Sequence, residues 1–270
     1  MIKSRIIPSL LIKNNRCVKG VNFSNHIDVG SPISSAKIYE AQGADELMII
    51  NILPTNFNAQ FIDTIKTMSY ECYMPLTVGG GIKTIENMKN LFRNGADRII
   101  LNQTAINNPK IIESSSIEFG SQAIVISIDY SYGKDMKPYV IDRSADQKKL
   151  DPIEWAIYCE KMGAGEIIFT CVDNEGQKKG MDLEFIRKLS TMVNLPIVPS
   201  GGVGKLSDIF EVLNIDKINA VGIGSILNFS DQSVIKIHSY LHQKGVNLSL
   251  IHISEPTRRT PISYAVFCLK

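Results

Sequence analysis

The sequence predicts an α/β fold in which eight parallel strands alternate with helices and close into a barrel. Short apolar, β-rich runs recur along the chain, and each is followed by an amphipathic stretch of helical length. The strand runs are continuously apolar, which indicates burial on both faces in a parallel sheet that helices cover. Eight such units are the number that a (β/α)8 TIM barrel requires. A doubly wound sheet is the alternative, but it seldom needs eight such regular units.

The elements follow from these runs in chain order. The expected strands are apolar stretches rich in Ile, Val and Leu, at Ile6–Ile12, Leu47–Asn51, Pro75–Val78, Arg98–Asn102, Ala123–Asp129, Glu166–Cys171, Ile197–Ser200 and Ala220–Gly224. The expected helices lie between strands and are amphipathic, as at Ile33–Gln42, Ile85–Arg93, Ile153–Met162, Leu183–Met192 and Asp231–Lys244.

The chain also repeats itself at half its length. Three motifs recur in the same order at an offset near ~120 residues, which predicts a barrel built from two fused half-barrels of four strands each. The matched pairs are Gly43-Ala-Asp-Glu46 with Gly163-Ala-Gly-Glu166, Pro75-Leu-Thr-Val-Gly-Gly-Gly81 with Pro196-Ile-Val-Pro-Ser-Gly-Gly202, and Leu101-Asn102-Gln103 with Ile223-Gly224-Ser225.

Composition excludes several classes of protein. A formal charge of +2 is too small to argue for nucleic acid or an anionic membrane as a partner. The five cysteines are scattered and lack CxxC spacing, so we expect reduced thiols rather than disulfides or zinc. No run approaches the roughly 18 apolar residues of a membrane span. We therefore expect a soluble, cytoplasmic protein with no metal site.

The last residues do not belong to the repeating pattern. Residues 1–249 are expected to form a single barrel domain, because the eighth helix ends near Gly245. Residues 250–270 look like the translation of a sequencing adapter, and they carry no weight in the fold or the function. The alternative is a genuine tail, which changes neither.

Glycine-rich turns follow the third and seventh expected strands. Active sites of such barrels lie at the carboxyl ends of the strands, where glycine lets backbone N–H groups approach an anion. Each turn is expected to lie beside the loop of the next strand. The sequence therefore predicts two phosphate sites on opposite sides of one mouth, formed by Gly80, Gly81, Asn102 and Gln103 and by Gly201, Gly202, Gly224 and Ser225. The alternative is tight turns without a ligand.

Seven motifs together carry a family resemblance. They are Arg5-Ile-Ile-Pro8, Val18-Lys19-Gly20, Asp45-Glu46-Leu47, Thr77-Val-Gly-Gly-Gly-Ile82, Gly120-Ser-Gln-Ala123, Gly163-Ala-Gly-Glu-Ile167 and Pro199-Ser-Gly-Gly202. From about Lys3 to Leu248 the chain resembles the cyclase subunit of imidazole glycerol phosphate synthase. The resemblance implies an enzyme, a lyase without metal or organic cofactor. It implies that ammonia from a glutaminase subunit, bound as a heterodimer, reacts with a bisphosphate. The products are imidazole glycerol phosphate and an aminoimidazole carboxamide ribotide.

The same resemblance implies a pair of catalytic aspartates at the ends of strands one and five. Asp129 matches one of them, but Leu11 stands at the position of the other and cannot transfer a proton. A helix or turn cap is the alternative role for Asp129. The residues implied near the substrate are Lys19, Asn51, Thr170, Glu175 and Ser200. Asn51 and Glu175 replace family aspartates, and Gln103 replaces a threonine that helps the first phosphate site.

Four charged residues match a gate at the amino-terminal face of the family's barrel. Arg5, Glu46, Arg98 and Glu166 can pair reciprocally and seal a narrow ammonia channel. Arg98 stands where lysine is usual, and its wider fork can gate differently. Structural ion pairs at the barrel bottom are the alternative. A surviving gate implies a surviving glutaminase partner.

Three functions remain open from the sequence. The first is a paralogue that delivers ammonia for amidination of surface-glycan sugars. Leu10-Leu11 and Asp151-Pro-Ile-Glu-Trp155 resemble the subunits of that group. The second is an authentic histidine-pathway cyclase, favoured by Val18-Lys19-Gly20 and by Lys244-Gly-Val-Asn247. The third is a non-catalytic module that docks on a glutaminase and activates it. They divide on whether the barrel turns over the bisphosphate.

Overall fold

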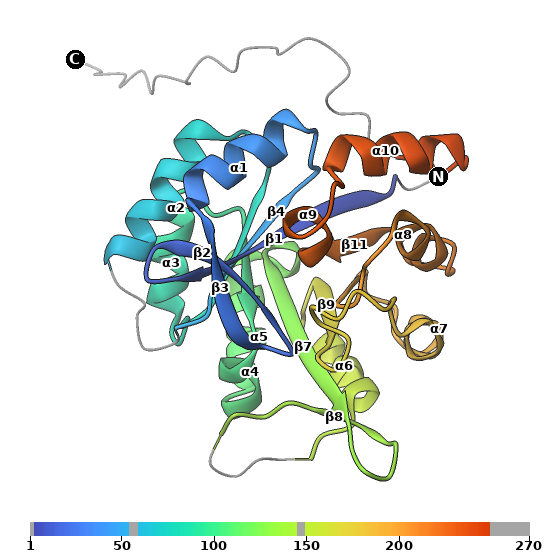
Figure 1. Ribbon diagram of the computed structural model, residues 1–270. Coiled ribbons are helices and arrows are strands. Elements are labelled where there is room, and N and C mark those ends of the chain that lie inside the picture. Colours follow the sequence, from blue (N-terminus) through green and yellow to red (C-terminus); the bar gives the residue numbers. More distant parts are fainter. Residues whose placement is uncertain (1–2, 54–58, 145–148, 249–270) are drawn as a thin grey trace, which may run out of the picture.

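Strands β1 (Arg5–Lys13) and β11 (Ala220–Ile223) pair in parallel, and this pairing closes the sheet into a barrel (Figure 1). The computed structural model describes residues 3–53, 59–144 and 149–248. Within these ranges the barrel continues from β1 through β4 (Leu47–Asn51), β5 (Leu76–Gly79), β6 (Arg98–Leu101), β7 (Ile124–Tyr132), β9 (Glu166–Cys171) and β10 (Ile197–Ser200). The doubly wound alternative is therefore wrong, because its first and last strands would lie apart.

The β10 and β11 strands lie side by side without a ladder among the described residues. A Cβ built on Gly222 would fall 3.1 Å from the Cβ of Ser200, so the two strands are in contact. Three barrel strands separate β1 from β7 on either side. Side chains at the ends of β1 and β7 therefore face each other across the mouth.

Helices surround the barrel (Figure 1). The longer ones are α1 (Pro32–Ala41), α2 (Ala59–Glu71), α3 (Ile85–Arg93), α5 (Lys110–Phe119), α6 (Pro152–Lys161), α7 (Leu183–Met192), α8 (Leu206–Leu213) and α10 (Val234–Gln243). Short helices follow β6 and β11 at α4 (Gln103–Asn107) and α9 (Ser225–Asn228), and a 3-10 turn, η1 (Ser121–Ala123), precedes β7. The helix expected from Asp231 begins later, because Ser233 caps it by accepting from the N–H of Lys236.

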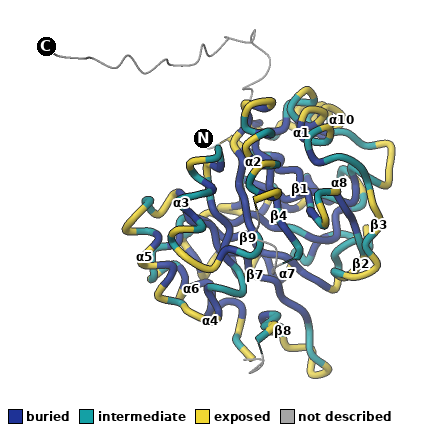
Figure 2. The backbone as a smooth tube through the Cα atoms, turned by 90° about the vertical axis from the view of Figure 1, so that its left-hand side faces the viewer, coloured by how far each residue is buried: buried dark blue, intermediate teal, exposed yellow. Residues whose placement is uncertain are grey.

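Two apolar layers explain the continuously apolar strands. Alternate residues of each strand point outward to the helices and inward to the barrel axis, and both sets are buried (Figure 2). The outer layer is the main core between strands and helices. The inner layer fills the barrel and consists of Ile7, Met48, Ile100, Val125, Ile168, Val198 and Ala220.

Two hairpins at the carboxyl ends of the strands were not expected from the sequence. After β1 the chain folds back as β2 (Arg16–Val21) and β3 (Ser24–Gly30), and after β7 it folds back as β8 (Pro138–Val140). Asn14 and Asn15 connect β1 to β2 with φ of 49° and 57°. Asparagine tolerates this left-handed region, which two-residue hairpin turns require.

The backbone repeats where the sequence repeats. Asn102 directly follows β6 and has φ −132° and ψ −98°, and Gly224 directly follows β11 and has φ −147° and ψ −80°. Each residue lies directly before a short helix. The expected fusion of two half-barrels agrees with this equivalence. The adapter-like residues 250–270 lie outside the described residues.

Candidate active site

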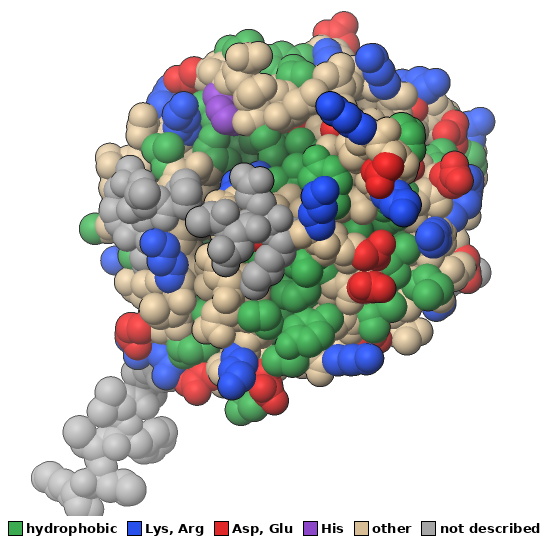
Figure 3. All heavy atoms as spheres, turned by 90° about the horizontal axis from the view of Figure 1, so that it is seen from below, with side chains coloured by type: hydrophobic (Ala, Val, Ile, Leu, Met, Phe, Trp, Pro, Cys, Tyr) green, Lys and Arg blue, Asp and Glu red, His purple; other side chains and the backbone are tan. Residues whose placement is uncertain are grey.

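A cavity of about 680 Å³ opens at the carboxyl ends of the strands. Figure 3 views the side on which β7 ends, where apolar side chains form the floor of a hollow and basic side chains lie around it. Every residue expected to bind or transform a ligand lines this cavity: Leu11, Lys19, Asn51, Gly80, Gly81, Asn102, Gln103, Asp129, Thr170, Glu175, Ser200, Gly201, Gly202, Gly224 and Ser225. Their individual roles stay predictions.

The two glycine turns lie on opposite sides of the cavity, since β5–β6 and β10–β11 are opposite in the strand order. Gly80 and Gly81 have φ of 96° and 73°, and Gly201 and Gly202 have φ of 89° and 100°. A Cβ on Gly80 would lie 2.0 Å from the carbonyl oxygen of Asn51. A Cβ on Gly201 would likewise lie 2.8 Å from the carbonyl oxygen of Cys171, so both turns need glycine to keep their backbone against the end of the preceding strand.

Two buried polar atoms at the mouth lack a hydrogen-bond partner among the described residues. They are Oδ1 of Asn102, directly after β6, and Oγ of Ser225, two residues after β11. An unpaired buried polar group costs free energy, so such atoms are expected where a ligand completes the bonding. Both atoms lie where the sequence predicts a phosphate, but only the Ser225 hydroxyl can donate to one, because the Asn102 oxygen accepts and needs a ligand donor.

Asp129 lies near the end of β7 and is buried. Burial raises the pKa of its carboxyl group, and three neighbours oppose that rise. Arg143 places Nη2 3.6 Å from Oδ2, Asn102 donates from Nδ2 to Oδ2 over 2.8 Å, and Ser127 donates to Oδ1 over 3.3 Å. The carboxyl group thus faces the cavity with a raised pKa, as a proton-transfer group would.

Leu11 faces Asp129 across the mouth, because β1 and β7 are opposite strands. An acid pair would need a carboxylate at that point, and an aliphatic side chain supplies none. Lys13, two residues further on, does not line the large cavity. The described residues therefore place one carboxylate, Asp129, on this axis of the mouth.

Lys19 reaches from strand β2 into the cavity beside the predicted phosphate site at β10–β11. Its side chain is buried, and burial lowers the pKa of its ammonium group while Glu175 opposes that change. A Cβ on Gly224 would fall 2.1 Å from Nζ of Lys19, so glycine at position 224 leaves room for this cation. The N–H of Asn22 donates to the carbonyl of Glu175 over 2.9 Å and ties the β2–β3 hairpin to the loop after β9.

The carboxamide of Gln103 is engaged away from the predicted phosphate. Its Oε1 accepts from the backbone N–H of Arg143 over 2.7 Å, and its Nε2 donates to Asp142 over 2.7 Å and to Asn107 over 2.9 Å. Arg143 itself was missed by sequence reasoning. It lies in a polar loop without a motif, and no local signal marks it.

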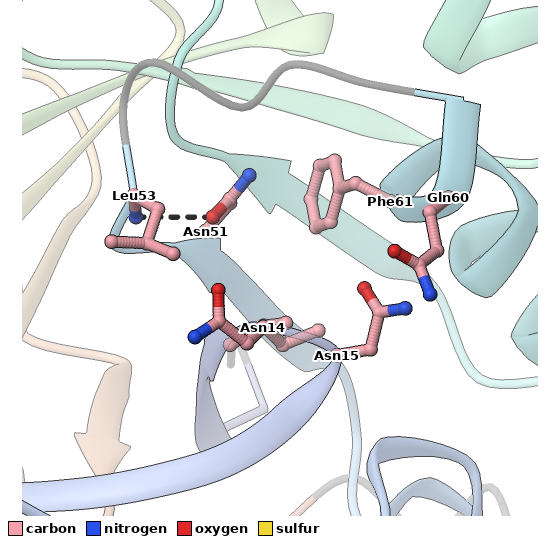
Figure 4. A pocket seen from close by; sticks show the side chains of 7 residues that line it. Asn14, Asn15, Asn51, Leu53, Gln60 and Phe61 are labelled. Carbon is pink, nitrogen blue, oxygen red and sulfur yellow. Dashed lines mark hydrogen bonds between the residues drawn. The ribbon is translucent and has the colours of Figure 1, made fainter.

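Asn51 borders a second, smaller pocket of about 120 Å³ as well as the large cavity. Figure 4 shows Asn14, Asn15, Gln60 and Phe61 around this small pocket. Oδ1 of Asn51 accepts from the N–H of Leu53 over 3.1 Å. The Asn51 side chain thus supports its own turn.

The four residues expected at the gate form a ring at the amino ends of the strands. Arg5 donates to Glu46 over 2.8 Å and forms a short contact with Glu166, while Arg98 lies 3.3 Å from Glu46 and also contacts Glu166 closely. Burial disfavours the charged form of Arg5, but the two carboxylates outweigh it and raise its pKa. The apolar inner layer lies between this ring and the cavity, where Met48, Ile100 and Ile168 form part of the cavity lining.

The described residues offer neither a group of metal ligands nor a membrane-spanning helix. No group of three or more His, Cys, Asp or Glu side chains is placed to hold a metal ion. No helix within the described ranges is both long and apolar enough to cross a membrane.

Comparisons with known proteins point to one family. The model of a family described as "Histidine biosynthesis protein" matches residues 5–233. A protein named imidazole glycerol phosphate synthase subunit HisF, from Clostridium botulinum (strain 657 / Type Ba4), is 41% identical over 253 residues, covering 93% of this chain and 100% of the relative. Proteins of the same name from Lactococcus lactis subsp. lactis (strain IL1403) and Alkaliphilus metalliredigens (strain QYMF) are 38% and 36% identical. The match to the Lactococcus protein covers 93% of this chain and 98% of the relative, and the match to the Alkaliphilus protein covers 92% and 99%.

Proposed function

The chain belongs to the histidine biosynthesis protein family, and we propose that it is a cyclase-type subunit of imidazole glycerol phosphate synthase that binds a bisphosphate at the barrel mouth. One observation carries this proposal. Two glycine turns with backbone N–H groups lie on opposite sides of one cavity, and beside the second turn the buried hydroxyl of Ser225, which can donate to an anion, has no partner among the described residues. Two anion sites across one mouth match a ligand with a phosphate at each end.

The ring at the amino-terminal face supports delivery of ammonia through the barrel. Arg5, Glu46, Arg98 and Glu166 close that end, and an apolar layer separates them from the cavity. The relatives are named as subunits, and we propose a glutaminase subunit docked over this end. Helices of the barrel end on this side, where Tyr73, Ile117 and Met192 are exposed and supply apolar surface for docking.

We further propose that Leu11 makes the chain a paralogue that supports sugar amidination. With leucine opposite Asp129, no described residue supplies a second carboxylate on this axis of the mouth to move a proton at the ammonia adduct. Asp129 then supports a slower reaction or another acceptor. The second candidate is an authentic histidine-pathway cyclase, favoured by identity of 41% to a HisF subunit over that subunit's whole length.

The experiment that separates these functions supplies the chain with saturating ammonium and the bisphosphate, and follows release of imidazole glycerol phosphate. Clear turnover establishes the histidine-pathway cyclase and overturns the paralogue. Binding of the bisphosphate without turnover supports the paralogue. Absence of binding overturns the proposal that the two glycine turns hold phosphates.

A further inference from the structure

One guanidinium lies over the mouth of the large cavity. Nη2 of Arg143 is 3.6 Å from Oδ2 of Asp129, and Cζ lies 5.6 Å from the ring centroid of Phe23 on the β2–β3 hairpin. The Arg143 side chain is 51% exposed. A guanidinium carries five N–H donors in a planar fork, so most of them remain available to a ligand in the cavity.

The position of this guanidinium depends on Gln103. The carboxamide of Gln103 accepts from the backbone N–H of Arg143 over 2.7 Å and donates to Asp142 over 2.7 Å. Its carboxamide is therefore engaged in holding the segment that carries Arg143, although Gln103 also lines the cavity.

The two sides of the mouth then carry matching cations. On the β10–β11 side, Nζ of Lys19 lies against Gly224, next in sequence to Ser225, whose Oγ has no partner among the described residues. On the β5–β6 side, Arg143 shares Oδ2 of Asp129 with Nδ2 of Asn102.

We propose that Arg143 binds the substrate phosphate on the β5–β6 side of the mouth, as the counterpart of Lys19 on the other side. The inference rests on the proposed binding of a bisphosphate and names a residue that distinguishes this chain's site. A bidentate guanidinium suits a phosphate better than an ammonium does, because its planar fork matches two phosphate oxygens.

The test measures binding of the bisphosphate by calorimetry. We expect Arg143→Gln to weaken binding about 10- to 100-fold, the range of a lost charge-assisted contact. Arg143→Lys should recover only part of the loss, since it keeps the charge without the fork. Arg93→Gln removes the same charge from the outside of the barrel, where the side chain is 71% exposed, and should bind like the parent.

The two reaction products separate recognition from structural damage. Each carries one phosphate, so Arg143→Gln should weaken binding of one product and leave the other unchanged. Equal weakening of both would overturn the inference, as would unchanged binding of the bisphosphate by Arg143→Gln. Loss of affinity in Lys83→Gln but not in Arg143→Gln would also overturn it, because Lys83 follows the first glycine turn and also lines the cavity. A parent chain that binds no bisphosphate overturns the proposed function and this inference together.

Discussion

Asn102 donates from Nδ2 to Oδ2 of Asp129 over 2.8 Å and so joins the first glycine-turn site to the candidate catalytic carboxyl group. The same amide leaves Oδ1 buried without a partner among the described residues. A ligand group that donates to Oδ1, such as a hydroxyl, would therefore complete the hydrogen bonding of Asn102 while its amide N–H orients Asp129.

This bond predicts a shift in the titration of Asp129. Burial raises the pKa of its carboxyl group, and the Asn102 amide opposes that rise. Asn102→Ala removes a donor to the charged form, so the pKa should rise further and protonation should begin at higher pH as the solution is acidified. NMR titration of the Asp129 carboxyl carbon measures the change. Ser127→Ala should give a smaller shift, because its bond is longer at 3.3 Å. A pKa that fell in Asn102→Ala would contradict the argument.

Restoring an acid at position 11 should increase cyclase turnover. Leu11→Asp places a carboxyl group across the mouth from Asp129, and a general acid–base group typically contributes about 10²- to 10⁴-fold. The rate of imidazole glycerol phosphate release at saturating ammonium reports the gain. Leu11→Asn is the matched control, since it is similarly polar but carries no titratable proton. A rise of the same size in both variants would show that polarity alone, and not proton transfer, is limiting.

The charged ring should contribute more to stability than a surface ion pair does. Arg5→Met leaves Glu46 and Glu166 buried with Arg98 as their remaining cation in the ring. Removing one partner of a buried pair is strongly destabilising, and partial exposure of Arg5 reduces the loss to roughly 1–3 kcal/mol. Urea unfolding measures it. Arg16→Met breaks the exposed pair with Asp28 and should cost much less than Arg5→Met, because water screens that pair. Equal losses would argue against a tightly coupled ring.

The first glycine turn should not tolerate a side chain. In Gly80→Ala the new Cβ would lie 2.0 Å from the carbonyl oxygen of Asn51, at a backbone φ of 96°. We expect a loss of roughly 2–4 kcal/mol in the free energy of unfolding. Gly245→Ala has a similar positive φ of 77° but no atom within 4 Å, so its loss should be about 1–2 kcal/mol from backbone strain alone. Thermal unfolding compares the two, and a larger loss in Gly245→Ala would contradict the close approach.

Much of the barrel was predictable because its signals are local. The strands Leu47–Asn51, Glu166–Cys171 and Ile197–Ser200 were predicted with the bounds that the structure has, as were the helices Ile85–Arg93 and Leu183–Met192. Apolar runs mark strands that are buried on both faces, and caps such as Thr84 mark helix starts. The β2–β3 hairpin was missed, since its strands are short and partly exposed.

The sequence by itself determined the order of strands, the repeat of half-barrels, the two glycine turns and the absence of an acid at position 11. Each of these depends on residue types at neighbouring positions, which a pattern records directly. Only the tertiary structure decided that Gln103 supports the loop at residues 142–143 and that Arg143 lies between Asp129 and Phe23. These contacts join segments that are distant in the chain, and barrel closure brings them together. No local pattern predicts these contacts, because they depend on where the intervening strands end in space.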